Sequence, residues 1–201
     1  YSSCSSEAHH HHDHDKAHHE TSEEDIAFAA GSTRTGFYGT KNITVSGSSG
    51  RYLASQTGNR NISITNLNGA NIGFSNSPPR GGSIISSSTT SGFGSSGNES
   101  YYMAAYWGAE KTWDMLREDF GRNGHDARGG KVNIFVNGSG QNLNNNAFWI
   151  GSWTYFGNAT SGAPFTPLDV VSHEIAHGVT QTTANLVYRN ESGAMNEGFS
   201  D

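Results

Sequence analysis

The chain has 201 residues, a formal net charge of −6 and one cysteine. This length suffices for one sizeable domain with a buried core, and no apolar run approaches the roughly 18 residues of a membrane-spanning helix. Seven of the 18 acidic residues and one of the 12 basic residues lie in the first 25 positions, so charge is balanced elsewhere. Because no basic block occurs, the sequence does not favour a nucleic-acid partner.

Residues 1–28 are predicted to be a disordered, histidine-rich leader. HHHHDHDKAHH (9–19) holds seven of the ten histidines and almost no apolar side chain, so burial cannot offset the entropy of folding. The segment is either a loose metal-binding tract or a linker, pro-segment remnant or cloning artefact, and its residues leave these alternatives open. Because the chain lacks an initial methionine and a helix-ending signal at Asp201, we expect a fragment of a longer protein.

Residues from Gly31 to about Gly97 are predicted to form an antiparallel β-meander. Short β-type runs alternate there with turn sequences such as SGSSG and SPPRGG, which is typical of strands joined by tight turns. The runs are NITV (42–45), RYLA (51–54), NISITN (61–66), ANIGF (70–74) and GSIIS (82–86). We interpret this region as scaffold.

A helix is predicted to follow, capped by Asn98 and stopped by Gly121. Apolar residues recur there at spacings of three and four, which indicates one buried face. They are Tyr102, Ala105, Tyr106, Ala109, Trp113, Leu116 and Phe120.

Strands are then predicted in KVNIFVNG (131–138), NNAFWIG (145–151) and SWTYFG (152–157), the last two joined by a turn at Gly151 and Ser152. A second helix is expected to begin with Thr166 as its cap and Pro167 in the first helical position. Asp169 stands where a capping-box acid would lie.

The second helix carries the sequence HEIAH, residues 173–177. His173 and His177 are one turn apart, so both imidazoles project from one face and can bind one ion. Glu174 is rotated by about 100° around the axis, which places it beside the ion without ligating it. In H-E-x-x-H metallopeptidases two histidines bind zinc and the glutamate takes a proton from water.

A third ligand is needed to separate this interpretation from a chance match. Metzincins continue with Gly and His after the second histidine, but Thr180 and Thr183 stand at the corresponding positions, which excludes that class. Glu197 is the candidate carboxylate ligand. Asp201 follows it by four residues, and metal-bound histidines usually donate their second N–H to such a carboxylate.

The segment VVSHEIAHGVTQTTANLVYRNESGAMNEGFSD (170–201) resembles the zinc site of thermolysin-like neutral metallopeptidases, the gluzincins of the bacillolysin and thermolysin type. NNAFW (145–149) resembles their edge strand and GSTRTGFYGTKNI (31–43) their mature start. The resemblance implies an α+β fold, with residues 29–201 as a β-rich N-terminal catalytic domain bearing two main helices. It also implies that a C-terminal helical domain is absent from this chain, so that the fragment alone is incomplete as an enzyme.

The resemblance implies specific roles for the site residues. Zinc would be held by His173, His177 and Glu197, with Glu174 activating zinc-bound water to attack a peptide bond and Asp201 orienting a histidine. Tyr188 would stabilise the oxyanion, although it could be an ordinary core tyrosine. Asn146, Ala147 and Trp149 would pair with the substrate as an edge strand, although NAFW could be merely a half-buried strand.

The remaining implications concern ions, partners and location. Asp169 matches a calcium ligand of the family, but a role as a helix cap explains it equally well. The family resemblance implies a secreted zinc endopeptidase that acts on polypeptides and has its own pro-segment as inhibitor and chaperone, cleaved here near Ala29 or Ala30. Two rivals stay open, a metal-sequestering protein that uses the leader and an inactive family member. GNATSGAP (157–164) and NGSGQNLNN (137–145) depart from the family at the cleft rim and leave substrate preference open.

Overall fold

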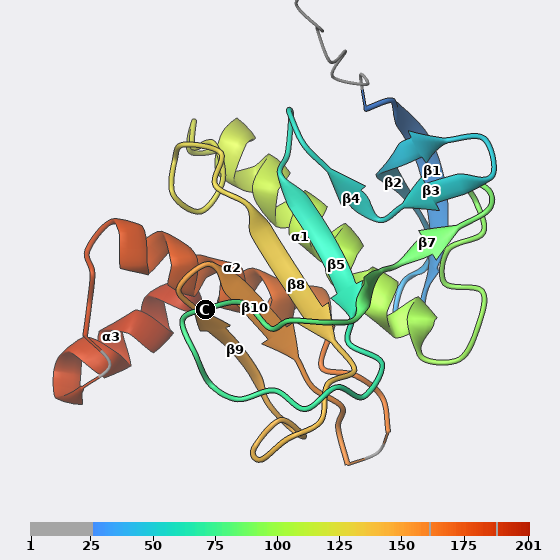
Figure 1. Cartoon of the computed structure of the whole chain (residues 1–201). Helices are drawn as coiled ribbons and strands as arrows, with labels where there is room; N and C mark the ends of the chain where they lie inside the picture. The colour runs from blue at the N-terminus through green and yellow to red at the C-terminus, as the bar shows by residue number, and fades with distance from the viewer. Residues whose placement is uncertain (1–25, 161, 188) are drawn as a thin grey trace, which may run out of the picture.

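A computed structural model describes residues 26–160, 162–187 and 189–201 (Figure 1). Two β-sheets and three helices make up this part of the chain, which confirms the predicted α+β class. The elements are β1 (Phe28–Thr35), β2 (Gly39–Ser48), β3 (Arg51–Leu53), β4 (Ser55–Gln56), β5 (Ile62–Asn66), β6 (Ser83–Ile84), β7 (Ser86–Ser87), α1 (Glu99–Glu118), β8 (Val132–Val136), β9 (Ala147–Ile150), β10 (Trp153–Phe156), α2 (Leu168–Thr182) and α3 (Asn190–Ser200). The first 25 residues of the predicted leader lie outside the described residues.

The first sheet has the strand order β1-β2-β3-β7, and all of its pairs are antiparallel. β1 is absent from the predicted strands, although it pairs with β2 over its whole length, from Phe28 opposite Ser46 to Thr35 opposite Gly39. Its sequence FAAGSTRT lacks a regular alternation of apolar and polar residues. The partner strand therefore specifies β1, and the strand begins at the last residue of the predicted leader.

The second sheet has the order β4-β5-β8-β10-β9, with β6 paired to β5. β8 runs parallel to both β5 and β10. The named strands before α1 pair with one another in antiparallel ladders, as predicted. However, β7 pairs with β3 and not with β6, so their order departs from a simple meander. The connection from β5 to β8 passes through α1, which allows the two strands to run in the same direction. ANIGF (70–74) is also not a strand, and its one pairing is an isolated bridge between Asn71 and Ser139.

Helix α1 packs against strands of both sheets and against α2. Tyr106 and Trp113 on its inner face are among the largest fully or almost fully buried side chains of the core. Phe120, however, is 70% exposed, so its predicted place on the buried face is wrong. The helix ends at Glu118, and Gly121 has a φ of 62°, which confirms it as the stop. Asn98 occupies the cap position, but its side chain makes no capping hydrogen bond.

The beginning of α2 differs from the predicted capping box. Pro167 is the cap residue with extended backbone and precedes the first helical position. The Thr166 hydroxyl donates to the Tyr101 carbonyl at 2.6 Å and does not cap the helix. The Leu168 N–H instead donates to the Tyr38 hydroxyl oxygen at 2.7 Å, so a tyrosine 130 residues earlier satisfies one amide at the helix start.

None of the helices among the described residues is both long and apolar enough to span a bilayer. The α2 helix instead buries one face in the core, where Val171 and Ile175 are 0% and 2% exposed. This packing fixes the rotation of α2 about its axis.

Candidate metal centre

The two histidines of the H-E-x-x-H sequence lie side by side on α2, as the helical spacing predicts. The His173 and His177 rings are 4.6 Å apart between centroids and almost perpendicular, at 89°. His177 is buried and His173 is partly exposed. Because Val171 and Ile175 point into the core, the histidines face the side of α2 on which α3 packs.

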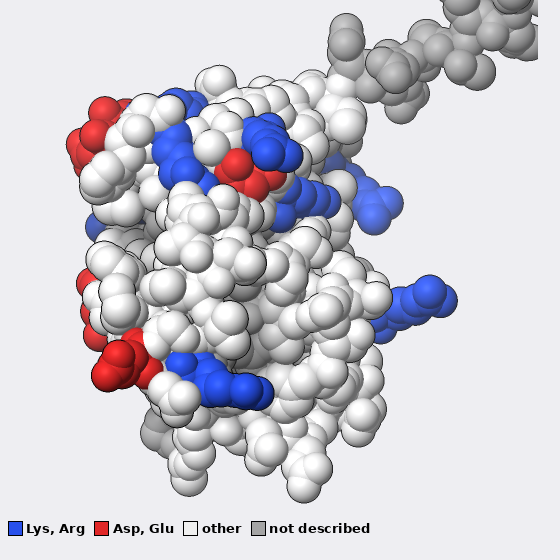
Figure 2. Space-filling view, turned by 90° about the vertical axis from the view of Figure 1, so that its left-hand side faces the viewer, with Lys and Arg blue, Asp and Glu red and all other residues white. Residues whose placement is uncertain are grey.

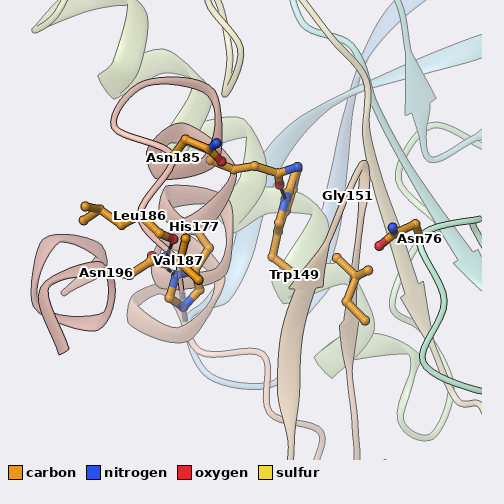
Figure 3. A pocket seen from close by; sticks show the side chains of 10 residues that line it. Asn76, Trp149, Gly151, His177, Asn185, Leu186, Val187 and Asn196 are labelled. Atoms are coloured by element: carbon orange, nitrogen blue, oxygen red, sulfur yellow. Dashed lines mark hydrogen bonds between the residues drawn. The ribbon is translucent and has the colours of Figure 1, made fainter. Parts of the chain in front are cut away.

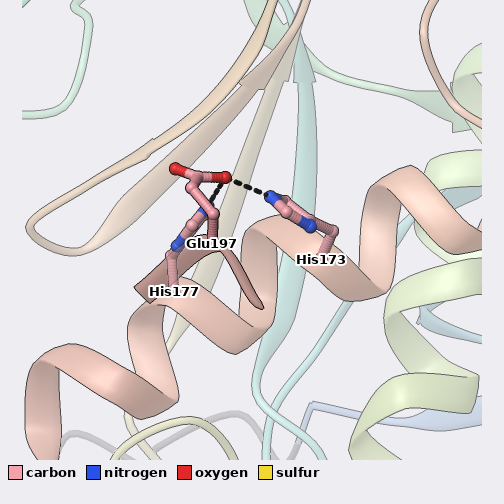
Figure 4. Close-up of side chains that lie close together, drawn as sticks. All are labelled: His173, His177 and Glu197. Carbon is pink, nitrogen blue, oxygen red and sulfur yellow. Dashed lines mark hydrogen bonds and ion pairs between the residues drawn. The ribbon is translucent and has the colours of Figure 1, made fainter. Parts of the chain in front are cut away.

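Glu197 on α3 meets both imidazoles (Figure 4). Its Oε2 lies 3.1 Å from His173 Nε2 and 3.7 Å from His177 Nε2. One ligand atom from each of the three residues lies within 4.8 Å of the others. Ligand atoms at 2.0–2.2 Å from one tetrahedral ion lie roughly 3.3–3.6 Å apart. Two nitrogens and a carboxylate oxygen fit zinc in chemistry, and the two separations from Glu197, 3.1 and 3.7 Å, lie on either side of this spacing.

Further side chains of α3 orient the imidazole rings. Asp201 Oδ1 lies 2.8 Å from His173 Nδ1, so the predicted pairing of Asp201 with a histidine is present as a contact. His177 Nδ1 lies 2.8 Å from Asn196 Oδ1 and 2.9 Å from the Ser200 hydroxyl. In these contacts each Nδ1 keeps its proton and donates it to an oxygen, which leaves the Nε2 lone pairs free to face Glu197.

Asn196 and Ser200 are site residues that the sequence analysis leaves out. The Asn196 amide donates its own N–H to the Leu186 carbonyl at 3.2 Å, which turns Oδ1 towards His177. The signal that could identify this pair is the same four-residue spacing as Glu197 and Asp201, one residue earlier on the same helix. Both residues are buried. Asn196 and Ser200 therefore orient His177, while Asp201, beside them, contacts His173.

Glu174 lies beside the metal centre, and its side chain is buried. The pKa of Glu174 is raised to about 7, chiefly by burial and in part by the charge of Glu197, against the lowering effects of His173 and the backbone N–H of Trp149. A carboxyl group with a pKa near neutrality can both accept and return a proton. The predicted role of Glu174 as a base is thus chemically available at this position.

The edge position predicted for NNAFW is present, because β9 has β10 as its ladder partner and lies at the end of the sheet. Asn146 precedes the strand and donates to the Asn142 carbonyl at 3.0 Å, while its own carbonyl accepts the Gly157 N–H. Ala147 begins the strand opposite Phe156. Substrate pairing by these residues stays a prediction.

Two hollows flank the metal centre along β9. One, of about 340 Å³, is lined by Asn146, Ala147, His173 and Glu174, among others. The other, of about 450 Å³, is lined by Trp149, His177 and Asn196, among others, and lies between β9, α2 and α3 (Figure 3). The metal centre thus stands between two spaces that could receive the two sides of an extended chain.

Two other predicted site residues stay untested. Tyr188 lies outside the described residues. Asp169 is exposed in the first turn of α2 and borders the 340 Å³ hollow. It belongs to no group of three potential metal ligands in the part of the chain that the structure describes, and its calcium role stays a prediction.

The surface turned to the viewer in Figure 2 is the left-hand side of Figure 1. Charged groups of both signs stand there in small clusters, separated by broad uncharged areas. A continuous basic patch, which a nucleic acid would require, does not occur on the described part of this face.

Comparison with known proteins also indicates a metallopeptidase. A family model described as "Thermolysin metallopeptidase, catalytic domain" matches residues 30–181. The chain is 48% identical over 100 residues to an extracellular elastase of Staphylococcus epidermidis, which covers 46% of this chain and 20% of that protein. It is 41% identical over 124 residues to a bacillolysin of Bacillus amyloliquefaciens, covering 60% and 23%.

A solved structure is also similar. The precursor of protealysin, a metalloproteinase from Serratia proteamaculans, aligns with a TM-score of 0.57 and 28% identity over 73% of this chain and 42% of that chain. The chain thus spans less than a quarter of the elastase and bacillolysin, and less than half of the protealysin precursor.

Proposed function

The chain belongs to the thermolysin metallopeptidase family, whose catalytic-domain model matches it over residues 30–181, and on that premise we propose that it is the zinc-binding part of an endopeptidase. The observation that carries the proposal is the convergence of His173, His177 and Glu197, with ligand atoms within 4.8 Å of one another. The buried carboxyl of Glu174 lies beside them.

His173, His177 and Glu197 would hold the ion, which supplies Lewis acidity and makes water more acidic. Asp201, Asn196 and Ser200 keep the two imidazoles in the orientation that this binding requires. Because these contacts already restrict the rotation of each ring, less rotational entropy is lost when an ion binds. They also hold the Nδ1 protons away from the ligand side.

Glu174 would take a proton from the attacking water and later deliver it to the leaving amine. Burial supports this role because it keeps the carboxyl near the protonation balance that such a shuttle needs. We assign Tyr188 to stabilisation of the oxyanion on the resemblance stated above. The peptide would lie along β9, which is the end strand of its sheet, with its side chains in the two flanking hollows.

We extend the proposal to location and processing. The name of the Staphylococcus relative describes an extracellular protein, which supports secretion. The protealysin match is a precursor, which supports a pro-segment that is removed near Ala29 or Ala30. The helical C-terminal part that the resemblance implies would complete the cleft, so the activity is best tested in the longest natural chain that contains these residues.

The deciding experiment compares wild type with Glu174→Gln, which keeps the shape of the side chain and removes the base. We expect both proteins to bind about one zinc ion per chain. Hydrolysis of casein and of an internally quenched peptide should fall by about 10²- to 10⁴-fold in the variant. Glu118→Gln, at the exposed end of α1, is the matched control.

Two results would count against the proposal. Equal hydrolysis by Glu174→Gln and wild type would remove Glu174 as the base. If removal of residues 1–25 abolished zinc binding, the metal would belong to the histidine-rich leader, and the metal-sequestering alternative would replace the enzyme.

A further inference from the structure

His125 lies next to β9, the edge strand beside the metal centre. Among the described residues, no contact joins it to the proposed metal ligands. It belongs to the loop between α1 and β8 and is only 6% exposed. Its ring lies 4.8 Å from the Trp149 ring between centroids, tilted by 58°. Because Trp149 is in β9, this contact connects a remote loop to the strand beside Glu174.

The Trp149 indole is held on several sides. Gly178 on α2 lies directly under it, and a Cβ added there would meet the ring at 2.6 Å. The indole N–H donates to Gln181 Oε1 at 3.0 Å, and His125 packs against the ring. With these partners, the partly buried Trp149 side chain anchors β9 to α2.

The loop that carries His125 is fastened to the end of the same helix. The His125 carbonyl accepts the Thr182 hydroxyl at 2.8 Å and an Arg122 N–H at 2.6 Å. Arg122 also donates to the Thr182 hydroxyl at 3.0 Å. These bonds hold the backbone of His125 at the end of α2, and from there its ring packs against the Trp149 indole.

The position of β9 matters because the strand has a single ladder neighbour, β10. Its other edge is open, so side-chain packing against α2 must hold it. The backbone N–H of Trp149 acts on the Glu174 carboxyl, and Trp149 also lines the 450 Å³ hollow beside His177. A shift of this strand would move both the hydrogen-bond donor and the wall of the hollow.

We propose that His125 is a positioning residue, whose uncharged ring holds the Trp149 indole against α2 and so keeps β9 beside Glu174. This inference rests on the proposed function for its effect on hydrolysis. The structural part is independent of that function, because it concerns the packing of a strand.

The chemistry of the imidazole matters as well as its shape. His125 Nδ1 is buried and has no hydrogen-bond partner among the described residues. Burial lowers the pKa of His125, Asp126 raises it and Arg122 lowers it. Both charged groups are on the same loop, whereas β9 and α2 present the uncharged Trp149 and Thr182 to it. A protonated ring would be a poorly solvated cation, so acidification should loosen the anchor.

The test compares His125→Ala, which removes the ring, with His125→Phe, which keeps a ring and cannot be protonated. Hydrogen exchange at the Trp149 amide is measured in the metal-free protein. We expect exchange to be on the order of tenfold faster in His125→Ala and to stay at the wild-type rate in His125→Phe. Arg128→Ala, an exposed position on the same loop, is the matched control.

Hydrolysis of a peptide by the metal-loaded full chain is the second readout. We expect kcat/KM to fall on the order of tenfold in His125→Ala and to recover in His125→Phe. The wild type should lose activity more steeply than His125→Phe as the pH falls below the usual imidazole range. If His125 only filled space, His125→Phe would restore kcat/KM but would leave the low-pH side of the activity profile unchanged.

Each outcome decides something. Unchanged exchange in His125→Ala, or equal losses in the Ala and Phe variants, would overturn the role of His125. If no protein hydrolyses the peptide but the exchange pattern appears, the proposed function fails while the anchoring of β9 by His125 stands.

Discussion

Two clusters of ionisable side chains in this molecule use similar groups but are completed in different ways. In the buried network of α1, Glu110 accepts the Thr44 N–H at 2.8 Å and the Gln56 amide at 2.6 Å. Arg60 lies 3.9 Å from Glu110 and forms two hydrogen bonds to Asp114, at 2.7 and 2.6 Å. Lys111 lies 3.5 Å from Asp114, so two cations of the fold face the two carboxylates.

The metal centre is built from carboxylates and imidazoles instead. The Glu197 side chain is 52% exposed and that of Asp201 is 80% exposed, and both face histidines. Burial lowers the pKa of His177, which disfavours an imidazolium as the counter-charge. A carboxylate cluster with an internal arginine is complete as a structural element, whereas the cluster of α2 and α3 has a donor set suited to an added cation.

Removal of the internal cation should give the largest effect on stability. Arg60→Met leaves Glu110 and Asp114 without their guanidinium, and we expect the free energy of unfolding in urea to fall by about 3 kcal/mol. Loss of one partner of a buried ion pair costs about 3–5 kcal/mol, and the lower value applies because the Arg60 side chain is 20% exposed. Zinc content should not change. If Arg60→Met were as stable as Arg51→Met, an exposed control on β3, the network would not be structural.

Weakening of one metal-centre contact should affect affinity and leave stability almost unchanged. Asp201→Asn replaces the carboxylate at His173 Nδ1 by a weaker acceptor, so zinc affinity should fall by about 10- to 100-fold. Competition with a chelating dye measures this change, with unfolding in excess chelator as the parallel measurement. Glu191→Gln, in the first turn of α3, is the control, and an affinity equal to this control would show that Asp201 does not orient the ring.

The smallest expected effect is a dependence of stability on pH. Burial raises the pKa of Glu110, against the hydrogen bonds from Thr44 and Gln56 and the charge of Arg60. The folded state therefore holds this proton more tightly than the unfolded state, and the contribution of Glu110 to stability decreases as pH rises from its usual value of 4.5. Glu110→Gln should lack this decrease.

Urea titrations from pH 4.5 towards neutrality would measure the difference in unfolding free energy between Glu110→Gln and wild type. This difference should shift in favour of the variant as pH rises. A constant difference would indicate that Glu110 has the same protonation in both states.

The metal centre was more predictable than the sheets because helical spacing is a local property. His173 and His177, like Glu197 and Asp201, are four residues apart and needed only a helix to share a face. Asn196 and Ser200 have the same spacing, but amides and hydroxyls are common and show no such role before α3 is docked. Tyr188 stays a prediction.

The differences in the fold arise where the pattern of a segment does not decide its structure. The parallel pairing of β5 with β8, about 70 residues later, has no local signal, and β1 depends on β2 for its pairing. Phe120 continues the apolar spacing of α1, but the helix ends at Glu118 and Gly121 has a positive φ, so Phe120 does not lie on the buried face. Thr166 has the residue type of a helix cap, yet Tyr101 offers its hydroxyl a competing acceptor.

The docking of α3 also bears on how long the protein lasts. This 11-residue helix has α2 as its main packing partner, and its contribution to the site is linked to α2 chiefly through the two histidines. Short helices are only marginally stable on their own, so an ion bound by residues of both helices would stabilise the packing of α3 against α2. We therefore expect loss of the ion to expose α3 to proteolysis. If the proposed function holds, a molecule that had lost its zinc would be cleaved by molecules that had kept it.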